Sequence, residues 1–220
     1  MKKFIGVLFI GLILIELCGF SFFNNEEIDN EFSIESLYNY EKEFEAEEIE
    51  TCASNSSKTY MDYRATTLVS SRQYQFMHNH CTVDKTGFLL DEDNFIAVAL
   101  GSFYGEIGDR FYFTLDSGVV LPLVKAEEKA DVDTDYRGCY HTIDGSVIEF
   151  VIDANEAARY FGVYGNGYVL SGNYNNYPTF NGEIVKVERV MDKKNTNKVT
   201  YSHVEINALS DDMFNYGSGY

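Results

Sequence analysis

Short runs of apolar residues that alternate with polar ones dominate the chain after residue 57. A two-residue period rich in Val, Ile, Tyr, Phe and Thr is typical of β-strands with a buried face. Gly, Asp and Asn separate the runs, so the pattern predicts a mainly β domain. The expected strands are residues 59–69, 95–103, 110–115, 119–124, 146–152 and 183–191, with residues 198–207 forming an extra C-terminal hairpin against the last of them.

Local signals predict how some of these segments are joined. Asp116-Ser117-Gly118 is typical of a hairpin turn, because its glycine can take a positive φ. Residues 156–161 predict one short helix, capped by Asp153 or Asn155 and ended by Gly162. Several strands with a single short helix favour a small barrel over a doubly wound sheet.

The N-terminus resembles a secretory signal. Lys2 and Lys3 precede an apolar run over residues 4–15, so residues 1–23 are interpreted as a signal peptide or, if uncleaved, a membrane anchor. Cys18 also suggests a lipoprotein, but the two residues before it are not the small or neutral ones expected there. Both interpretations predict export.

The net charge of −18 is concentrated near the N-terminus. Residues 24–50 hold eleven Asp or Glu against a single Lys, a net −10. We interpret residues 24–57 as an acidic linker outside the core, residues 58–207 as the folded domain and residues 208–220 as a flexible tail. No basic stripe is present to neutralise phosphates, so nucleic acid is excluded as a partner.

Signal cleavage would leave three cysteines, Cys52, Cys81 and Cys139. An odd number permits at most one intramolecular disulfide and leaves one thiol. The expected pair is Cys81 with Cys139, and the alternative is three free thiols.

The most unusual run is residues 144–153, where Glu149 interrupts an apolar strand. The two-residue period places Val151 on the same face as Glu149 and Phe150 on the other, so both faces are expected to be covered. A carboxylate in such a place needs a partner or a function.

Five blocks of sequence together resemble a known family. They are Phe95-Ile-Ala-Val-Ala, Glu106-Ile-Gly-Asp-Arg-Phe-Tyr-Phe, residues 119–126, Gly145-Ser-Val-Ile-Glu-Phe-Val-Ile and Ala154-Asn-Glu-Ala-Ala-Arg-Tyr-Phe-Gly. In this order they resemble the 3D domain of bacterial cell-wall proteins, which is related to membrane-bound lytic transglycosylase A. The resemblance covers residues 95–170 and implies a six-stranded double-psi β-barrel.

The resemblance also implies a pair of acids. Glu149 stands where the family has its essential Asp, and Glu127 takes the position of the carboxylate in the first half of the barrel. The family's earliest Asp is replaced near Ala99, and its glycine loop gives way to an insertion at residues 129–141. The residues expected to border the groove and contact a glycan are Lys129, Asp144 and His141.

A lytic transglycosylase needs one carboxyl group that gives a proton to the glycosidic oxygen and then takes one from the sugar's 6-hydroxyl. Glu149 is the expected acid and base, with Glu127 in support. No metal or cofactor is expected. The function expected is that of an exported cell-envelope protein acting on peptidoglycan. The alternative is a non-catalytic envelope barrel that binds glycan or serves as a scaffold.

Three other patterns have simpler interpretations. Asp131, Asp133 and Asp135 lack the Gly and Glu of a calcium loop and predict a polar loop. His78-Asn79-His80-Cys81 lacks a completing zinc ligand cluster and predicts a surface turn. A group of tyrosines that might stack on sugars is expected mainly to pack in the core and turns: Tyr164, Tyr168, Tyr174 and Tyr177.

Overall fold

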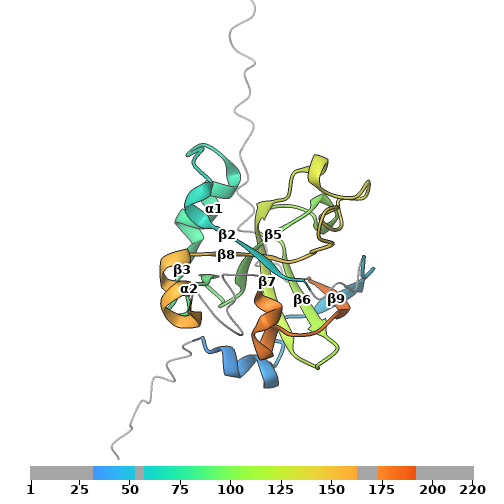
Figure 1. Ribbon diagram of the computed structural model, residues 1–220. Coiled ribbons are helices and arrows are strands. Elements are labelled where there is room, and N and C mark those ends of the chain that lie inside the picture. The colour runs from blue at the N-terminus through green and yellow to red at the C-terminus, as the bar shows by residue number, and fades with distance from the viewer. Residues whose placement is uncertain (1–31, 53–56, 163–172, 192–220) are drawn as a thin grey trace, which may run out of the picture. The chain divides into compact units, whose positions relative to one another are not determined.

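Strands account for most of the regular structure of the molecule, which confirms the mainly β prediction (Figure 1). The structure is a computed structural model and describes residues 32–52, 57–162 and 173–191. The expected signal or anchor at residues 1–23, the hairpin of residues 198–207 and the tail lie outside the described residues.

Nine strands and two α-helices are present in these ranges. The strands are β1 (Ala46–Ile49), β2 (Thr59–Asp62), β3 (Cys81–Val83), β4 (Leu89–Asp91), β5 (Ile96–Leu100), β6 (Arg110–Leu115), β7 (Val120–Glu128), β8 (Glu149–Ile152) and β9 (Ile184–Val190). The α-helices are α1 (Arg72–His80) and α2 (Ala154–Phe161). Short 3-10 helices are η1 (Ile34–Asn39), η2 (Tyr63–Ala65), η3 (Ser102–Tyr104), η4 (Asp131–Asp133), η6 (Tyr174–Asn176) and η7 (Pro178–Phe180).

The strands form one mixed sheet in the order β1-β9-β6-β7-β5-β4-β3, with β8 joined to β5 and β2 joined to β8. Two pairs are parallel, β5 with β7 and β2 with β8, and the other pairs are antiparallel. The described strands therefore exceed the six expected, and the sheet that they form is not closed.

Both faces of the sheet are covered by apolar side chains. Along β5, Ile96 and Val98 belong to one core cluster, while Ala97 belongs to the other, in the alternation that a strand dictates. The first cluster is rich in aromatic rings and includes Phe161 of α2. The second includes Phe76 of α1. Strand β5 is consequently buried along its whole length.

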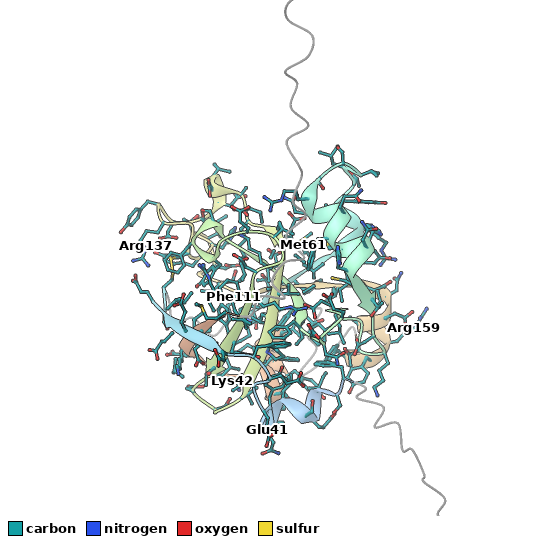
Figure 2. All side chains as sticks on the ribbon, turned by 180° about the vertical axis from the view of Figure 1, so that it is seen from behind. Glu41, Lys42, Met61, Phe111, Arg137 and Arg159 are labelled. Carbon is teal, nitrogen blue, oxygen red and sulfur yellow. A yellow bond between two sulfur atoms is a disulfide. The ribbon has the colours of Figure 1, made fainter. Side chains whose placement is uncertain are left out.

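Many charged side chains lie at the surface of the molecule, although several are buried. Figure 2 shows Phe111 of β6 in the interior, and Arg137 and Arg159 at opposite sides of the molecule. The side chain of Arg159 is 71% exposed, whereas Phe111 is fully buried. Arg137 lies on the long loop between β7 and β8.

Residues 32–52 belong to the fold, so the prediction of an acidic linker is wrong for this part of the chain. Phe32, Ile34 and Leu37 are buried in the first core cluster, and β1 pairs with β9. The isolated apolar side chains among the acids are thus core residues, while acids such as Glu47 and Glu48 face solvent. A high density of charge concealed a short amphipathic segment.

Two further local predictions need correction. The strand expected over residues 59–69 ends at Asp62, whose side chain accepts a hydrogen bond from the backbone N–H of Arg64 and so starts η2. Helix α1, which the sequence analysis missed, begins where Ser71 Oγ accepts a hydrogen bond from the N–H of Tyr74.

Other local predictions are confirmed. The turn at Asp116-Ser117-Gly118 joins β6 to β7, and Gly118 has a φ of +87°. The Asp153 side chain caps α2 by accepting hydrogen bonds from two backbone N–H groups, and Gly162 follows its last residue.

Candidate functional site

The two glutamates singled out from the sequence flank a single alanine of β5. Ala99 pairs with Glu127 of β7 on one side and with Glu149 of β8 on the other. Glu149 also pairs with Thr59 of β2. Paired residues on neighbouring strands project to the same face of a sheet, so the glutamates share a face. Their Cα atoms, two strands apart, lie roughly 10 Å from each other.

A β-bulge creates this arrangement. Val98 pairs with Lys125, but the next residue of β5, Ala99, pairs with Glu127, so the register slips past Ala126. Without the extra residue, Ala126 would oppose Ala99 and Glu127 would project to the opposite face. The bulge is therefore what brings the two carboxylates to one face.

Ala99 separates the glutamates with a single methyl group. It is 1% exposed, while both glutamates are half-buried and retain contact with solvent. A larger side chain at this position would project between the two carboxylates. The position where the family resemblance implied a third acid is thus a small, buried apolar residue between Glu127 and Glu149.

Glu127 is held in place by two hydrogen bonds. Thr66 Oγ1, in the segment between η2 and α1, donates to Glu127 Oε2 at 2.6 Å. The backbone N–H of Glu128 donates to Glu127 Oε1 at 2.9 Å. Glu127 lies within β7, because this strand extends four residues beyond the predicted end at residue 124.

Lys129 is buried, and it lies near Glu149. Its Nζ donates to the carbonyl oxygen of Ser146 at 3.1 Å and to Ser146 Oγ at 3.3 Å. Burial lowers the pKa of Lys129, and the carboxylates of Glu149 and Asp144 act in the opposite direction. The ammonium group is therefore close enough to Glu149 for an electrostatic interaction, and it joins the two ends of the loop between β7 and β8.

Asp144 and His141 lie at the base of this loop. Asp144 Oδ1 accepts a hydrogen bond from the backbone N–H of Ser146 at 2.9 Å and lies 3.0 Å from His141 Nδ1. Partial burial raises the pKa of Asp144, but these hydrogen bonds outweigh it, and the pKa lies below its usual range. Lys129 thus lies near both Asp144 and Glu149, and His141 contacts Asp144.

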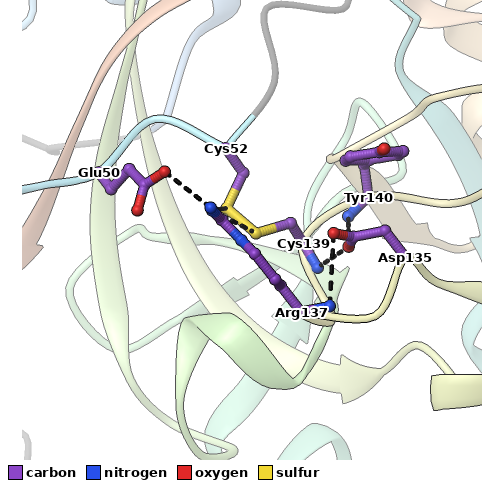
Figure 3. The surroundings of a disulfide bond; sticks show 6 residues. All are labelled: Glu50, Cys52, Asp135, Arg137, Cys139 and Tyr140. Atoms are coloured by element: carbon purple, nitrogen blue, oxygen red, sulfur yellow. Dashed lines mark hydrogen bonds and ion pairs between the residues drawn. A yellow bond between two sulfur atoms is a disulfide. The ribbon is translucent and has the colours of Figure 1, made fainter.

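A disulfide fixes the far part of the loop. Cys139 is bonded to Cys52, with a Cα–Cα distance of 5.7 Å (Figure 3). Cys81 is the free thiol among the described residues. The expected Cys81–Cys139 pair is therefore wrong, although one disulfide and one thiol are indeed present among these three residues. Cys81 instead lies on β3, opposite Asp91 of β4, where burial raises the pKa of its thiol.

Polar contacts surround the disulfide. Arg137 forms an ion pair with Glu50 at 2.9 Å, and Asp135 Oδ1 accepts hydrogen bonds from the N–H groups of Cys139 and Tyr140 (Figure 3). Partial burial raises the pKa of Asp135, but these hydrogen bonds outweigh it and lower the pKa. The acid at residue 135 is thus used to shape a polar loop, as the sequence predicts.

Two glycines let the loop approach the end of β5. A Cβ atom on Gly101 would lie 1.9 Å from the carbonyl oxygen of Gly138, and that oxygen accepts a hydrogen bond from the N–H of Phe103. Nearby, buried Lys125 donates to the carbonyl oxygens of Gly101 and Gly105. These supporting residues were not predicted from the sequence, where their signal is a lysine, Lys125, inside an apolar strand.

The other candidate groups lie outside this arrangement. The residues His78 and His80 belong to the last turn of α1, not to a surface turn, and their rings stack on Tyr74 and Phe76. Within the described ranges, no group of three His, Cys, Asp or Glu side chains is placed to bind a metal ion. Tyr174 is buried in the aromatic core, which confirms its packing role. Tyr164 and Tyr168 lie outside the described residues.

A cavity of about 330 Å³ lies away from the glutamates. Its lining residues are Asn79, His80, Cys81, Thr82, Leu90, Asp91 and Glu92. Because burial keeps the Cys81 thiol protonated, this cavity offers no activated nucleophile.

Comparisons with known proteins add no relative. No family model, curated protein or solved structure matches the chain. In the part of the chain that the structure describes, no helix is both long and apolar enough to cross a membrane.

Proposed function

We propose that this chain is an exported cell-envelope protein that cleaves peptidoglycan as a lytic transglycosylase. The observation that carries the proposal is one rung of the sheet, meaning a row of residues paired across neighbouring strands. This rung consists of Glu127, Ala99 and Glu149. Two half-buried glutamates share one face beside an alanine, and both keep contact with solvent. The bulge next to Ala99 adds support, since bulges are common beside active sites.

In the proposed reaction Glu149 acts twice. Its protonated carboxyl donates the proton to the glycosidic oxygen as the bond from that oxygen to C1 breaks, which releases one sugar as an alcohol. The resulting carboxylate then takes the proton of the 6-hydroxyl while O6 bonds to C1. The glutamate regains its proton and a 1,6-anhydro ring is formed without water. Glu127 stabilises the positive charge that develops at C1.

The double-psi β-barrel is also part of the proposal. Two parallel pairs, β5 with β7 and β2 with β8, occur in a sheet whose other pairs are antiparallel. Strand β5 brings the ends of β7 and β8 together at the glutamates, because it pairs in parallel with β7 and antiparallel with β8. A sheet that mixes parallel and antiparallel pairs supports a double-psi β-barrel better than it supports a simple antiparallel meander.

Export is supported by the covalent link between Cys52 and Cys139. Disulfides persist in oxidising compartments and are rare in the cytosol. We therefore place the protein at the outer face of the cytoplasmic membrane or beyond it, in agreement with the signal-like N-terminus.

One observation favours a second candidate, a non-catalytic module that binds or organises envelope glycan. Both glutamates already have partners in the protein: Glu127 accepts two hydrogen bonds, and Glu149 interacts with the ammonium group of Lys129. In this alternative the carboxylates shape a binding surface and transfer no proton.

The test is to incubate the full chain with purified cell-wall sacculi and to measure soluble 1,6-anhydro muropeptides by mass spectrometry. Glu149→Gln is expected to abolish their release. Glu156→Gln, which makes the same change on exposed α2, serves as the matched control. Equal release by Glu149→Gln would remove this residue from the mechanism. Binding to sacculi without release by the unaltered chain would favour the non-catalytic module.

A further inference from the structure

The loop between β7 and β8 exposes apolar side chains to an unusual degree. Val132, Tyr136 and Ile143 are 86%, 96% and 86% exposed. Residues of this kind are normally covered in part, and several of them on one loop are typical of a contact surface. The insertion therefore does not fill the site with its apolar side chains, because these point into solvent.

Hydrogen bonds bring the two halves of this loop together. The N–H of Thr142 donates to the carbonyl oxygen of Asp133 at 2.8 Å, next to Val132 in one half and Ile143 in the other. Thr134 and His141 form an isolated β-bridge in the same place. The two aliphatic side chains are consequently carried on adjoining segments of the loop.

The loop is also tied to the body of the protein. The Cys52–Cys139 bond, the Arg137–Glu50 ion pair and a hydrogen bond from Ser102 Oγ to Asp131 at 2.9 Å all hold it. The guanidinium of Arg137 lies over the ring of Phe103 as well. A surface that is fixed before binding loses little conformational entropy when a ligand binds, so exposed apolar groups on it are well suited to recognition.

Both ends of the loop lie at the paired glutamates. Lys129 follows Glu127 by two residues, Ser146 precedes Glu149 by three, and the side chain of Lys129 joins these ends. The loop that carries the exposed apolar residues therefore starts and ends beside the proposed site.

The charges on the loop limit what the ligand can be. Asp131, Asp133 and Asp144 are exposed beside the apolar residues, so an anionic lipid surface would be repelled. A sugar ring matches the mixture better, since it has an apolar C–H face and a rim of hydroxyl donors. The C–H face can lie on an aromatic ring such as Tyr136, while hydroxyl groups donate to neighbouring carboxylates.

We infer that Tyr136, with Val132 and Ile143, forms a glycan-binding platform that holds sugar rings of the chain beyond the bond at Glu149. The identity of the ligand as a glycan rests on the proposed function. Nearly complete exposure leaves the ring of Tyr136 open for stacking, and Val132 and Ile143 add two exposed apolar side chains on the same loop.

The test measures binding of the full chain to chitotetraose by calorimetry and to sacculi by sedimentation. Tyr136→Ala is expected to weaken both by about tenfold, whereas Tyr136→Phe keeps the stacking ring and retains binding. Val132→Ser with Ile143→Ser is expected to give a smaller loss. Tyr38→Ala, which removes a half-exposed tyrosine from η1, is the matched control and should bind normally.

Two outcomes would overturn the platform. One is unchanged glycan binding by Tyr136→Ala. The other is that Tyr136→Ala loses binding only to neutral phosphatidylcholine vesicles, which would indicate a membrane contact. Release of anhydro products by the same proteins separates this inference from the proposed function. If the unaltered chain releases no products but its binding depends on Tyr136, catalysis fails and the platform stands. If products form and Tyr136→Ala binds normally, the proposed catalysis stands and the platform fails.

Discussion

Two groups of charged side chains lie in the same sheet, and they differ in how completely their charges are paired. Between β4 and β6, Arg110 is 5% exposed and contacts the 1% exposed side chain of Asp91 at 2.7 Å and that of Asp93 at 2.6 Å. At the rung of Ala99, Glu127 and Glu149 are half-buried, and the nearest buried cation is Lys129.

The difference separates charges that stabilise the fold from charges that remain available for chemistry. The guanidinium of Arg110 is surrounded by carboxylates. Burial lowers its pKa, but the charges and hydrogen bonds of Asp91 and Asp93 together outweigh this effect and raise it. Such a saturated group has no proton to exchange. Around Ala99 the two glutamates outnumber the neighbouring Lys129 and keep contact with water.

The largest effect is expected from Arg110→Met. Removing the cation leaves Asp91 buried without a counter-charge, so the free energy of unfolding should fall by about 3–5 kcal/mol. Urea denaturation followed by circular dichroism measures this loss. Arg159→Met, on the exposed face of α2, should change stability by less than about 0.5 kcal/mol. Equal effects of the two substitutions would show that the cluster around Arg110 is not a closed, stabilising one.

A pH series tests another buried cation, Lys58. Its Nζ donates a hydrogen bond to the carbonyl oxygen of Gly182 at 2.8 Å. Burial lowers the pKa of Lys58 to about 8, against about 10.4 for an unfolded chain. Between these values the folded protein binds fewer protons than the unfolded one, so stability should rise as pH increases from about 8 to about 9.5, by up to about 2 kcal/mol. Lys58→Met should lack this rise, and an identical slope in both proteins would contradict the assignment.

Lys129→Met should have a smaller effect than Arg110→Met. The substitution leaves Ser146 without its hydrogen-bond donor, but half-exposed Glu149 can be hydrated, so a loss of about 1–2 kcal/mol is expected. Thermal unfolding of Lys129→Met beside Lys85→Met, a change at an exposed surface lysine, gives the comparison. A loss as large as that of Arg110→Met would mean that the carboxylates around Ala99 depend on Lys129 for stability.

The smallest effect on stability is expected from Glu149→Gln, within about 1 kcal/mol, because the side chain is half-exposed and similar in size. The same variant should lose the release of anhydro products. Differential scanning calorimetry and the sacculus assay on one preparation check both statements. Strong destabilisation by Glu149→Gln would make Glu149 a structural acid like Asp91, and the contrast between the two clusters would disappear.

Much of the fold follows from local patterns in the sequence. The alternation of apolar residues locates β6 and β9 over their full lengths, and the capping residue Asp153 with Gly162 bounds α2. Glu149 is recognisable as an acid within an apolar strand. Each of these signals depends on neighbours within a few residues, where side-chain direction and turn geometry are fixed by the backbone.

Other features depend on segments that are far apart in the chain. The Cys52–Cys139 bond spans 87 residues, and β1 was concealed because its acids point to solvent while its partner β9 lies at the other end of the chain. Neither pairing has a local signal, because a strand edge or a thiol can meet any partner that the fold brings near.

The sequence by itself determined that the protein is mainly β and that Glu149 needs a partner or a function, since composition and a two-residue period express which faces are buried. Only the tertiary structure decided that Glu127 and Glu149 share a face across Ala99. That result depends on the β-bulge between β5 and β7, where Ala126 of β7 is an extra residue without a partner in the register. A slip of one residue reverses every side chain of a strand, and no alternation read along a single strand can reveal where its neighbour slips.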